Sequence, residues 1–299
     1  IILVIAPKLF LSAPPMHWKE QVPIDSIHYL IQQYKRSGFD FIKILSVPSE
    51  AFYEATMAES RLAGLPVVGH IPNRNLHLAL SKNQRSIEHL QGYTDYFKAK
   101  QFDALQNVIQ ITAEKGIYNC PTLDWYFVGS LHYSLESLKH RAGMAYISPA
   151  LKQEWEKKIL EYTKEQNSNQ VSKKEDSLGL VAMRNVMEKL KLKGCKLLLS
   201  PDASSVFQVP GFGLVEEMKI FKELGFTNYE ILRMASLGSA EYFGEDNWGK
   251  VREGHEANLV LLSQNPLENI ENLLKVKGVI LNGKWLSQSI VLEKIRQSK

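Results

Sequence analysis

The chain has 299 residues, of which 44% are hydrophobic and 23% are charged, and its formal net charge is +4. This composition is ordinary for a folded globular protein, and the length suits one large α/β barrel or two ordinary domains. The basic residues form no stripe with interleaved aromatic residues, which argues against a nucleic-acid-binding protein. No stretch reaches the roughly 18 apolar residues that a membrane span requires.

The two cysteines, Cys120 and Cys195, lie in or beside apolar runs and lack the spacing of a zinc knuckle. A cysteine in such a run is usually a small buried hydrophobic residue. The cysteines therefore leave the cellular compartment open, between cytoplasmic and periplasmic or secreted. The chain begins at Ile1 inside an apolar run, from which we expect further sequence upstream.

Strand-like and helix-like segments alternate along most of the chain. Strands are predicted over residues 7–13, 39–45, 66–71, 86–90, 117–120 and 196–200, and helices over 25–35, 50–62, 75–81, 102–115 and in two segments between 214 and 237. Near-continuous apolar strands joined by helices indicate βαβ units and a parallel sheet that is covered on both faces. Because a closed (β/α)₈ barrel needs eight strands, the sequence predicts an α/β TIM-type barrel lacking about two of them.

Two regions interrupt this alternation. Residues 124–193 contain many aromatic residues and then a highly charged helical stretch, which is typical of an insertion in one loop of the barrel. This insertion is either a lid over a pocket or a solvated helical hairpin on the barrel rim. From residue 247 the pattern changes to short hairpin strands, so we expect a barrel over 1–246 and a small β unit over 247–299.

Polar side chains capable of chemistry stand at the ends of several predicted strands. Lys43 ends FDFIKI, His70 lies in VVGHIP, His89 lies in SIEHLQG, and Asp202 follows KLLLS. In a parallel barrel the active-site residues lie at the C-terminal ends of the strands. One histidine on an apolar strand is more often a hydrogen-bonded core residue than a ligand. Two histidines at successive strand ends would face one pocket, however, and neutral imidazole binds divalent metals.

Lys43 and Asp202 each have two interpretations. A lysine in a strand buried on both faces is costly unless paired, so Lys43 either extends to the barrel end or is carbamylated into a carboxylate-like metal bridge. Asp202 is either a helix cap or a group that takes a proton from metal-bound water. We expect Glu88 to point away from His89 and to make a structural ion pair or hydrogen bond.

The chain carries Lys43, His70, His89 and Asp202 in this order. In this it resembles the metal-dependent amidohydrolase superfamily, in particular the branch of imidazolonepropionase-like enzymes and amidohydrolase-type dipeptidases. GFDFIKI is similar to the family's lysine strand, VVGHIP and SIEHLQG to its two histidine strands, and LLSPDA to its aspartate strand. The tail, including GKVREGHEANLVLLSQNPLENI, resembles the family's C-terminal β-sandwich strands. The resemblance covers essentially the whole chain.

The resemblance implies a hydrolase that cleaves amide-like carbon–nitrogen bonds of a small-molecule or dipeptide-like substrate through a metal-bound hydroxide. Lys43 would be the carbamylated bridging ligand, and His70 and His89 would hold the second metal. Asp202 would be the general acid/base and would also touch the first metal. The expected cofactor is a divalent metal, zinc by preference, with two ions in a complete parent chain and at most the second site here.

The chain departs from the family pattern in two places. It contains no HxH pair, which the family's first strand brings to the first metal, so we expect an N-terminally incomplete chain. The aspartate motif reads SPDA, where the family has Gly followed by Thr or Ser before the aspartate. A catalytically inactive or truncated barrel that binds a small molecule or partner is therefore the alternative. The substrate, the native metal and the oligomeric state, including a homo-oligomer, stay open.

Overall fold

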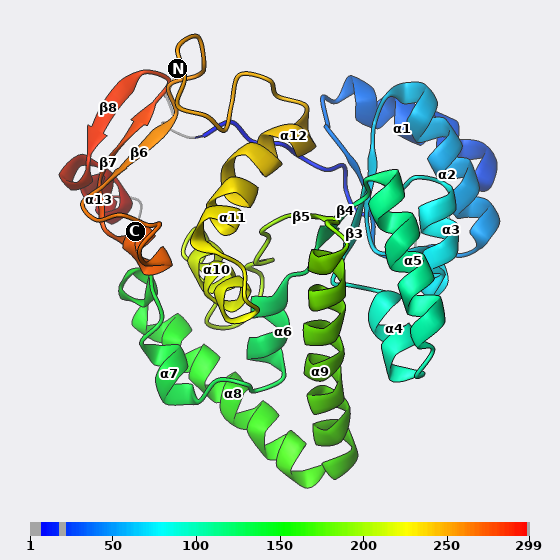
Figure 1. The fold of residues 1–299 in the computed structure, drawn as a ribbon, viewed down its shortest axis with the longest axis horizontal. Helices are drawn as coiled ribbons and strands as arrows, with labels where there is room; N and C mark the ends of the chain where they lie inside the picture. Colours follow the sequence, from blue (N-terminus) through cyan, green and yellow to red (C-terminus); the bar gives the residue numbers. More distant parts are fainter. Residues whose placement is uncertain (1–6, 18–21, 298–299) are drawn as a thin grey trace. The chain divides into compact units, whose positions relative to one another are not determined.

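The computed structural model of the chain describes residues 7–17 and 22–297 (Figure 1). The chain divides into two compact units. The first consists of Ile1–Pro121 and Leu178–Leu197, and the second consists of Thr122–Ser177 and Leu198–Lys299. The long helix α9 (Gln170–Leu192) contributes residues to both units.

The first unit is built on a parallel sheet. Its five strands among the described residues are β1 (Ile42–Ile44), β2 (Val67–Gly69), β3 (Ser86–Glu88), β4 (Tyr118–Cys120) and β5 (Lys196–Leu197), and they pair in chain order. Helices α2 (Glu50–Ala63), α3 (Leu76–Ser81), α4 (Tyr93–Lys98) and α5 (Phe102–Lys115) connect successive strands, while α1 (Ile27–Arg36) precedes β1. Parallel strands in sequential order joined by helices form the wall of a (β/α) barrel. The predicted α/β class is therefore confirmed.

Local sequence signals explain where these helices begin and end. The Ser49 hydroxyl accepts the Phe52 backbone N–H at 3.1 Å, which caps the start of α2 as predicted. The helix ends at Gly64, whose φ of 66° is a left-handed conformation that glycine adopts without steric cost. The same helix buries Phe52 and Tyr53 against the fully buried Ile42 of β1. The hydrophobic core of the first unit therefore forms between the strands and the helices that cover them.

The predicted strand over 7–13 does not form a regular strand in the described residues 7–17. The described segment 7–17 makes isolated parallel bridges from Ser12 to Phe41 and from Met16 to Ile44 instead. Pro14 and Pro15 explain this difference, because a proline has no N–H to donate and interrupts a hydrogen-bond ladder. The segment thus lies beside β1 without extending the sheet as a continuous strand.

The second unit is mainly helical around a separate core. Its helices are α6 (Leu123–Gly129), α7 (Leu135–Lys139), α8 (Pro149–Ser168), α10 (Gly213–Glu223), α11 (Asn228–Arg233) and α12 (Ser239–Phe243), with a π-helical turn over Met234–Gly238. Trp155 and Ile159 of α8 pack in one cluster with Val206, Phe207 and other buried residues. The inserted helix α8 therefore shares a core with the segment that follows Asp202.

The C-terminal part of the second unit contains a small antiparallel sheet, as predicted. Its strands are β6 (Leu259–Leu262), β7 (Val276–Leu281) and β8 (Lys284–Ser287), and helix α13 (Gln288–Gln297) follows. Asn282 and Gly283 connect β7 to β8 with positive φ angles of 51° and 75°, as a tight two-residue hairpin requires. The predicted division into 1–246 and 247–299 stays a prediction.

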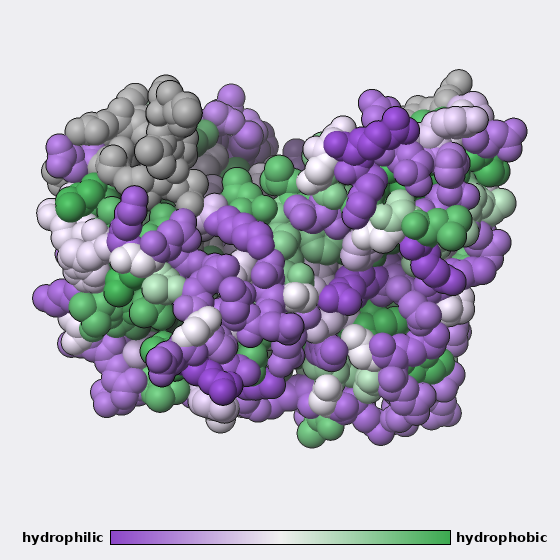
Figure 2. Space-filling view, turned by 90° about the horizontal axis from the view of Figure 1, so that it is seen from above, coloured by the Kyte–Doolittle hydropathy of each residue, from purple (hydrophilic) through white to green (hydrophobic). Residues whose placement is uncertain are grey.

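The surface of the protein is mixed in character. Figure 2 shows hydrophilic residues over most of one face, with hydrophobic residues scattered among them. Such scattered apolar residues are ordinary for a folded chain. In the described part of the chain, no helix combines the length and apolar character needed to cross a membrane.

Candidate metal centre and the aspartate segment

Three of the four predicted site residues come together in the first unit. Lys43 is the central residue of β1, His70 directly follows β2, and His89 directly follows β3. These strands are parallel neighbours, so residues at their C-terminal ends reach the same edge of the sheet. The centroids of the His70 and His89 rings lie 5.0 Å apart, with an angle of 74° between the ring planes.

Backbone geometry at Gly69 and His89 makes this approach possible. Gly69 has a φ of 115°, and a Cβ at this position would lie 2.3 Å from the Ile44 carbonyl oxygen, so only glycine fits. His89 would point to the opposite face from His70 if β3 continued as a regular strand. Its φ of 60° ends the extended conformation and allows the ring to lie near His70.

The hydrogen bond of His70 defines its tautomer. Its Nδ1 lies 2.8 Å from the Leu45 carbonyl oxygen. A carbonyl oxygen only accepts, so Nδ1 carries a hydrogen, and in the neutral ring Nε2 then holds the lone pair. Histidine ligands in metal sites commonly donate the other ring N–H to a carbonyl in this way. In its neutral form, His70 would therefore present Nε2 to a metal ion.

The environment of His89 favours the neutral ring. Burial lowers the pKa of His89 from 6.5 to about 3, and the positive charges of His70 and Lys43 add to this effect. His89 is therefore neutral at pH 7, which is the form in which imidazole binds metals.

Lys43 forms an ion pair with Glu88, the last residue of β3. The side chains are only 22% and 15% exposed, so the pair is largely removed from solvent. Lys43 is level with Val68, and Val68 with Ser86, so Glu88 falls on the face that Lys43 occupies. The predicted ion pair of Glu88 is confirmed. The expectation that Glu88 points away from the histidine site is wrong, because His89 lies beyond the regular alternation of the strand.

The donor set fits a divalent transition metal only in part. Among the described residues, no group of three or more His, Cys, Asp or Glu side chains is arranged to hold a metal ion. His70 and His89 supply two imidazole donors of the kind that zinc and similar ions prefer. The neighbouring Lys43 becomes a ligand only if its cationic amine is converted to an anion. The described residues therefore supply two of the donors that a metal site needs.

Asp202 lies in the second unit, in an irregular segment between β5 and α10. It is exposed and has a φ of 48°, and its carbonyl oxygen accepts the Ser204 backbone N–H at 2.6 Å. The alternative that Asp202 caps a helix is wrong, since the next helix begins only at Gly213. The Asp202 residue is thus accessible to solvent.

A buried polar network in the same unit includes residues that the sequence did not single out. Asp124 is fully buried and pairs with Arg141, and it accepts a hydrogen bond from Gln208 Nε2 at 3.0 Å. The buried Glu217 carboxyl accepts the backbone N–H groups of Leu123 and Asp124 at 3.0 and 2.7 Å. Burial raises the pKa of Glu217 from 4.5 to about 8.

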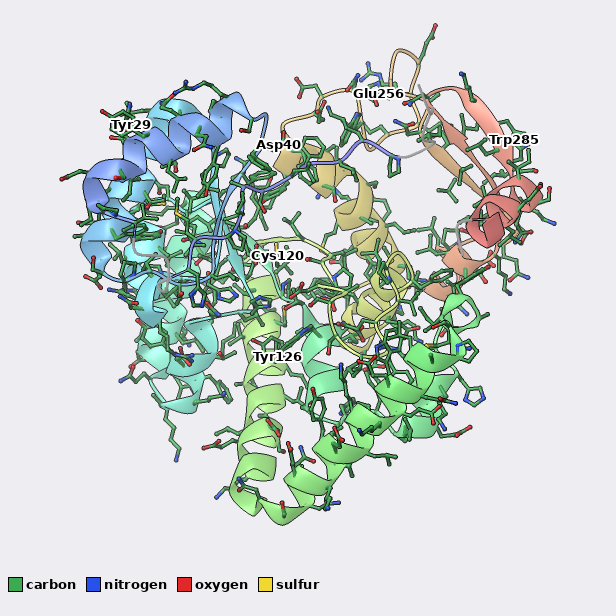
Figure 3. All side chains as sticks on the ribbon, turned by 180° about the vertical axis from the view of Figure 1, so that it is seen from behind. Tyr29, Asp40, Cys120, Tyr126, Glu256 and Trp285 are labelled. Atoms are coloured by element: carbon green, nitrogen blue, oxygen red, sulfur yellow. The ribbon has the colours of Figure 1, made fainter. Side chains whose placement is uncertain are left out.

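Of the residues in this network, only Asp124 has a sequence position that points to a functional site. Asp124 follows the predicted strand over 117–120, whose last residue Cys120 is labelled in Figure 3, so the strand-end argument extends to it. Arg141 and Gln208 lie in segments without a recognisable pattern, and only the tertiary fold brings them to Asp124.

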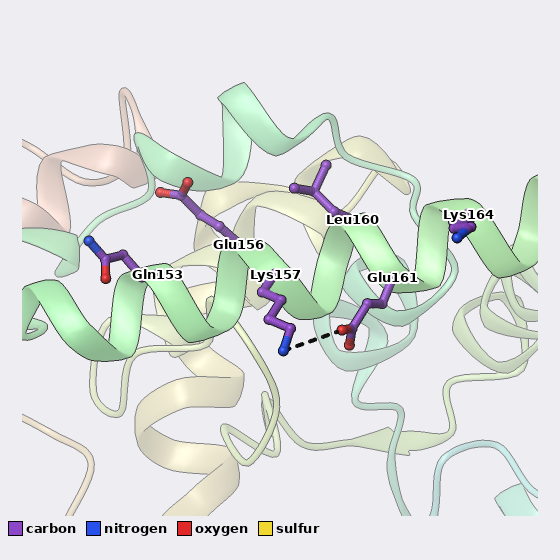
Figure 4. A pocket seen from close by; sticks show the side chains of 6 residues that line it. All are labelled: Gln153, Glu156, Lys157, Leu160, Glu161 and Lys164. Atoms are coloured by element: carbon purple, nitrogen blue, oxygen red, sulfur yellow. Dashed lines mark ion pairs between the residues drawn. The ribbon is translucent and has the colours of Figure 1, made fainter.

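Two surface hollows in the second unit differ in their relation to Asp202. One, of about 400 Å³, is lined entirely by residues of α8, including the Lys157–Glu161 pair (Figure 4). Such a hollow belongs to the outer surface of a single helix. The other, of about 420 Å³, is lined by Leu151 and Trp155 on one side and by Ser204 and Ser205 on the other. The second hollow therefore borders the segment that directly follows Asp202.

Comparison with known proteins places these features in a family context. The model of the amidohydrolase family matches residues 30–286. No curated protein sequence matches the chain significantly.

Several solved structures share the fold. A bottromycin amidohydrolase has a TM-score of 0.71 and 20% identity over 95% of this chain and 65% of its own. A Xaa-Pro dipeptidase with bound methionine in its active site has a TM-score of 0.62 and 19% identity over 89% of this chain and 59% of its own. The A. niger ochratoxinase has a TM-score of 0.62 and 17% identity, covering 89% of this chain and 55% of its own. The chain thus spans less than two thirds of the length of these structures.

Proposed function

Because this chain belongs to the amidohydrolase family, we propose that it is a hydrolase of amide-type carbon–nitrogen bonds in small, dipeptide-like substrates. The observation that carries this proposal is the pair of neighbouring imidazoles of His70 and His89. Their ring centroids lie 5.0 Å apart, and the Leu45 carbonyl holds the Nδ1 hydrogen of His70, so that Nε2 is the ligand atom of the neutral ring. Two neighbouring imidazoles of this kind are typical ligands of a divalent metal ion.

Lys43 would complete the ligand set as a carbamate. Its neutral amine attacks carbon dioxide, a nitrogen–carbon bond forms, and one proton is released, so that the side chain becomes an anion. Glu88, which faces a cation in the metal-free site, would then face a like charge. A bound cation offsets that repulsion, so carbamylation of Lys43 and metal binding support each other.

Asp202 would act as the general acid/base. When bound, a divalent metal supplies Lewis acidity, which lowers the pKa of a water molecule to about 7 and polarises a carbonyl group. The Asp202 carboxylate takes the proton of the attacking water and delivers it to the leaving amine nitrogen. Its exposed position leaves it accessible to a substrate.

Two observations support a dipeptide-like substrate. One of the similar structures is that of a Xaa-Pro dipeptidase. The hollow bordered by Trp155, Leu151 and the segment after Asp202 offers apolar surface to one side chain of a small substrate. Its volume of about 420 Å³ lies within the range of small-molecule sites.

The deciding experiment measures metal content and hydrolysis together. The chain is equilibrated with zinc, freed of excess metal and analysed by plasma mass spectrometry, alongside a His70→Ala/His89→Ala double variant. His77→Ala is the matched control, because His77 is exposed on α3. We expect bound zinc in the unmodified chain and the control, its loss in the double variant, and turnover of Xaa-Pro dipeptides with the same dependence.

Two other outcomes would separate the alternatives. Bound zinc without turnover of any dipeptide would favour a barrel that binds a small molecule or partner. Equal zinc content in the chain and the double variant would overturn the metal centre.

A further inference from the structure

We propose that Gln208 is a positioning residue that holds Asp202 in place for its role as general acid/base. This inference rests on the proposed function, since it concerns the residue that would move the proton. Its basis is the network of hydrogen bonds that surrounds the segment from Pro201 to Gln208 in the second unit. Neither the family match nor the sequence pattern assigns a role to Gln208.

The side-chain amide of Gln208 binds the chain on both sides of Asp202. Its Nε2 donates to the Pro201 carbonyl oxygen at 3.1 Å, and its Oε1 accepts the Ser205 backbone N–H at 3.2 Å. The Gln208 residue is only 2% exposed. Water therefore cannot replace these bonds without opening the segment, and the Gln208 side chain connects the residues before and after Asp202.

The turn at Asp202 needs such support. Its φ of 48° is a left-handed conformation, which costs free energy for a residue that has a Cβ. A conformation of this kind persists where the surrounding contacts fix it. The Ser204 N–H bond to the Asp202 carbonyl closes the turn from within, and Gln208 closes it from outside.

The buried ion pair of Asp124 and Arg141 holds the Gln208 side chain in one orientation. The second Nε2 hydrogen donates to Asp124 Oδ2 at 3.0 Å, and Asp124 pairs with Arg141 through its other oxygen. Arg141 also donates to the Phe207 carbonyl oxygen at 3.3 Å. A flipped amide would place Oε1 against the oxygens of Pro201 and Asp124, which only accept. The network therefore determines both the position and the direction of the Gln208 amide.

A first experiment tests whether the Gln208 side chain holds the turn at Asp202, and it requires no turnover of a substrate. We call the hydrogen bonds from Gln208 to Pro201 and Ser205 the clamp. Gln208→Met preserves the length of the side chain but removes its hydrogen bonds. Gln166→Met is the matched control, because Gln166 donates to Asp176 at 3.0 Å elsewhere in the same unit. Hydrogen–deuterium exchange is followed in peptides covering residues 201–209. We expect exchange at least about tenfold faster in Gln208→Met and unchanged in Gln166→Met, since each lost bond lowers the free energy of local opening. Unchanged exchange in Gln208→Met would overturn the clamp.

A second experiment tests whether the clamp acts through Asp202. Values of kcat and KM for the dipeptide Ala-Pro are measured, per bound zinc ion, for the chain, Gln208→Met, Asp202→Asn and the double variant. We expect Gln208→Met to lower kcat at least about tenfold with little change in KM, and to have no further effect when Asp202 is already replaced. A general loss of structure would instead lower kcat by the same factor in both backgrounds, and that result would overturn the positioning role.

The two experiments also separate this inference from the proposed function. If no dipeptide is hydrolysed, the proposed activity fails while the exchange measurement still decides whether Gln208 holds the turn. If hydrolysis occurs and exchange is unchanged, the proposed activity stands and the inference about Gln208 falls.

Discussion

The rings of His70 and His89 meet edge to face at the ends of neighbouring parallel strands, with 5.0 Å between their centroids. This relationship depends on two backbone features, the glycine before His70 and the left-handed conformation of His89. The positive charge of Lys43 also acts on the His89 ring, because it contributes to the low pKa of His89. Five predictions concern the surroundings of these residues and of the carboxyl groups of Glu88 and Glu217.

The approach of β1 to β2 depends on the absence of a side chain at Gly69. In Gly69→Ala the new Cβ would lie 2.3 Å from the Ile44 carbonyl oxygen at a φ of 115°, so the strands must separate. We expect the free energy of unfolding to fall by more than about 2 kcal/mol, together with a loss of zinc binding. Urea unfolding monitored by circular dichroism measures this change.

Gly129→Ala is the matched control for this substitution. No atom lies within 4 Å of a Cβ added at Gly129, which is the last residue of α6. We expect its stability to stay within about 1 kcal/mol of the parent chain. A similar loss of stability in both variants would show that Gly69 has no special role.

The buried His89 ring should stay neutral at pH values well below 6.5, the ordinary pKa of histidine. Its pKa falls from 6.5 to about 3 on folding, so the folded chain binds fewer protons than the unfolded chain between these values. Stability should therefore rise with pH from about 3 to 6.5 through this residue. In NMR titrations of the metal-free chain, we expect the His89 ring to remain neutral at pH 5, and Lys43→Met to raise its pKa. A midpoint near 6.5 in the folded chain would contradict the buried environment.

Glu217 should give the opposite dependence on pH. Burial raises its pKa from 4.5 to about 8, so the folded chain holds a proton that the unfolded chain releases. The contribution of Glu217 to stability should fall as pH rises from about 4.5 to 8. We expect Glu217→Gln to reduce this decline, as measured by urea unfolding at several pH values. Glu161→Gln, on the exposed face of α8, should leave the pH dependence unchanged.

Carbamylation of Lys43 should depend on metal. The amine pairs with Glu88 in the metal-free site, and an anion at this position would face the Glu88 carboxylate. With ¹³C-labelled bicarbonate, we expect a carbamate NMR signal in the presence of zinc and a much weaker signal without it. Lys43→Arg should abolish the signal, because arginine forms no such carbamate. An equally strong signal in Lys43→Arg would assign the carbamate to another residue.

The variant Glu88→Gln separates the effect of the Glu88 charge on the carbamylation of Lys43 from the effect of the metal. The substitution removes the charge that opposes the carbamate, so we expect more carbamate without zinc than in the unmodified chain. An unchanged dependence on zinc would show that Glu88 does not control the modification.

Much of the architecture could be predicted from the sequence because it depends on local patterns. Apolar runs predict the parallel strands, and Ser49 and Gly64 mark the ends of α2 in the sequence as in the structure. The placement of Lys43, His70 and His89 at one edge of the sheet follows from the same local rule. Residues 7–13 do not form a regular strand, because Pro14 and Pro15 follow them directly and interrupt the pairing with β1 between Ser12 and Met16.

Other features depended on contacts between residues far apart in the chain. The sequence by itself determined the α/β class, the order of the strands and the family resemblance, since each is encoded in short runs of residues. Only the tertiary structure decided that Glu88 is the partner of Lys43, and that Asp124, Arg141 and Gln208 surround the turn at Asp202. A buried polar group needs a partner, but its sequence position does not say which one, because that partner is chosen by the packing of whole helices and strands.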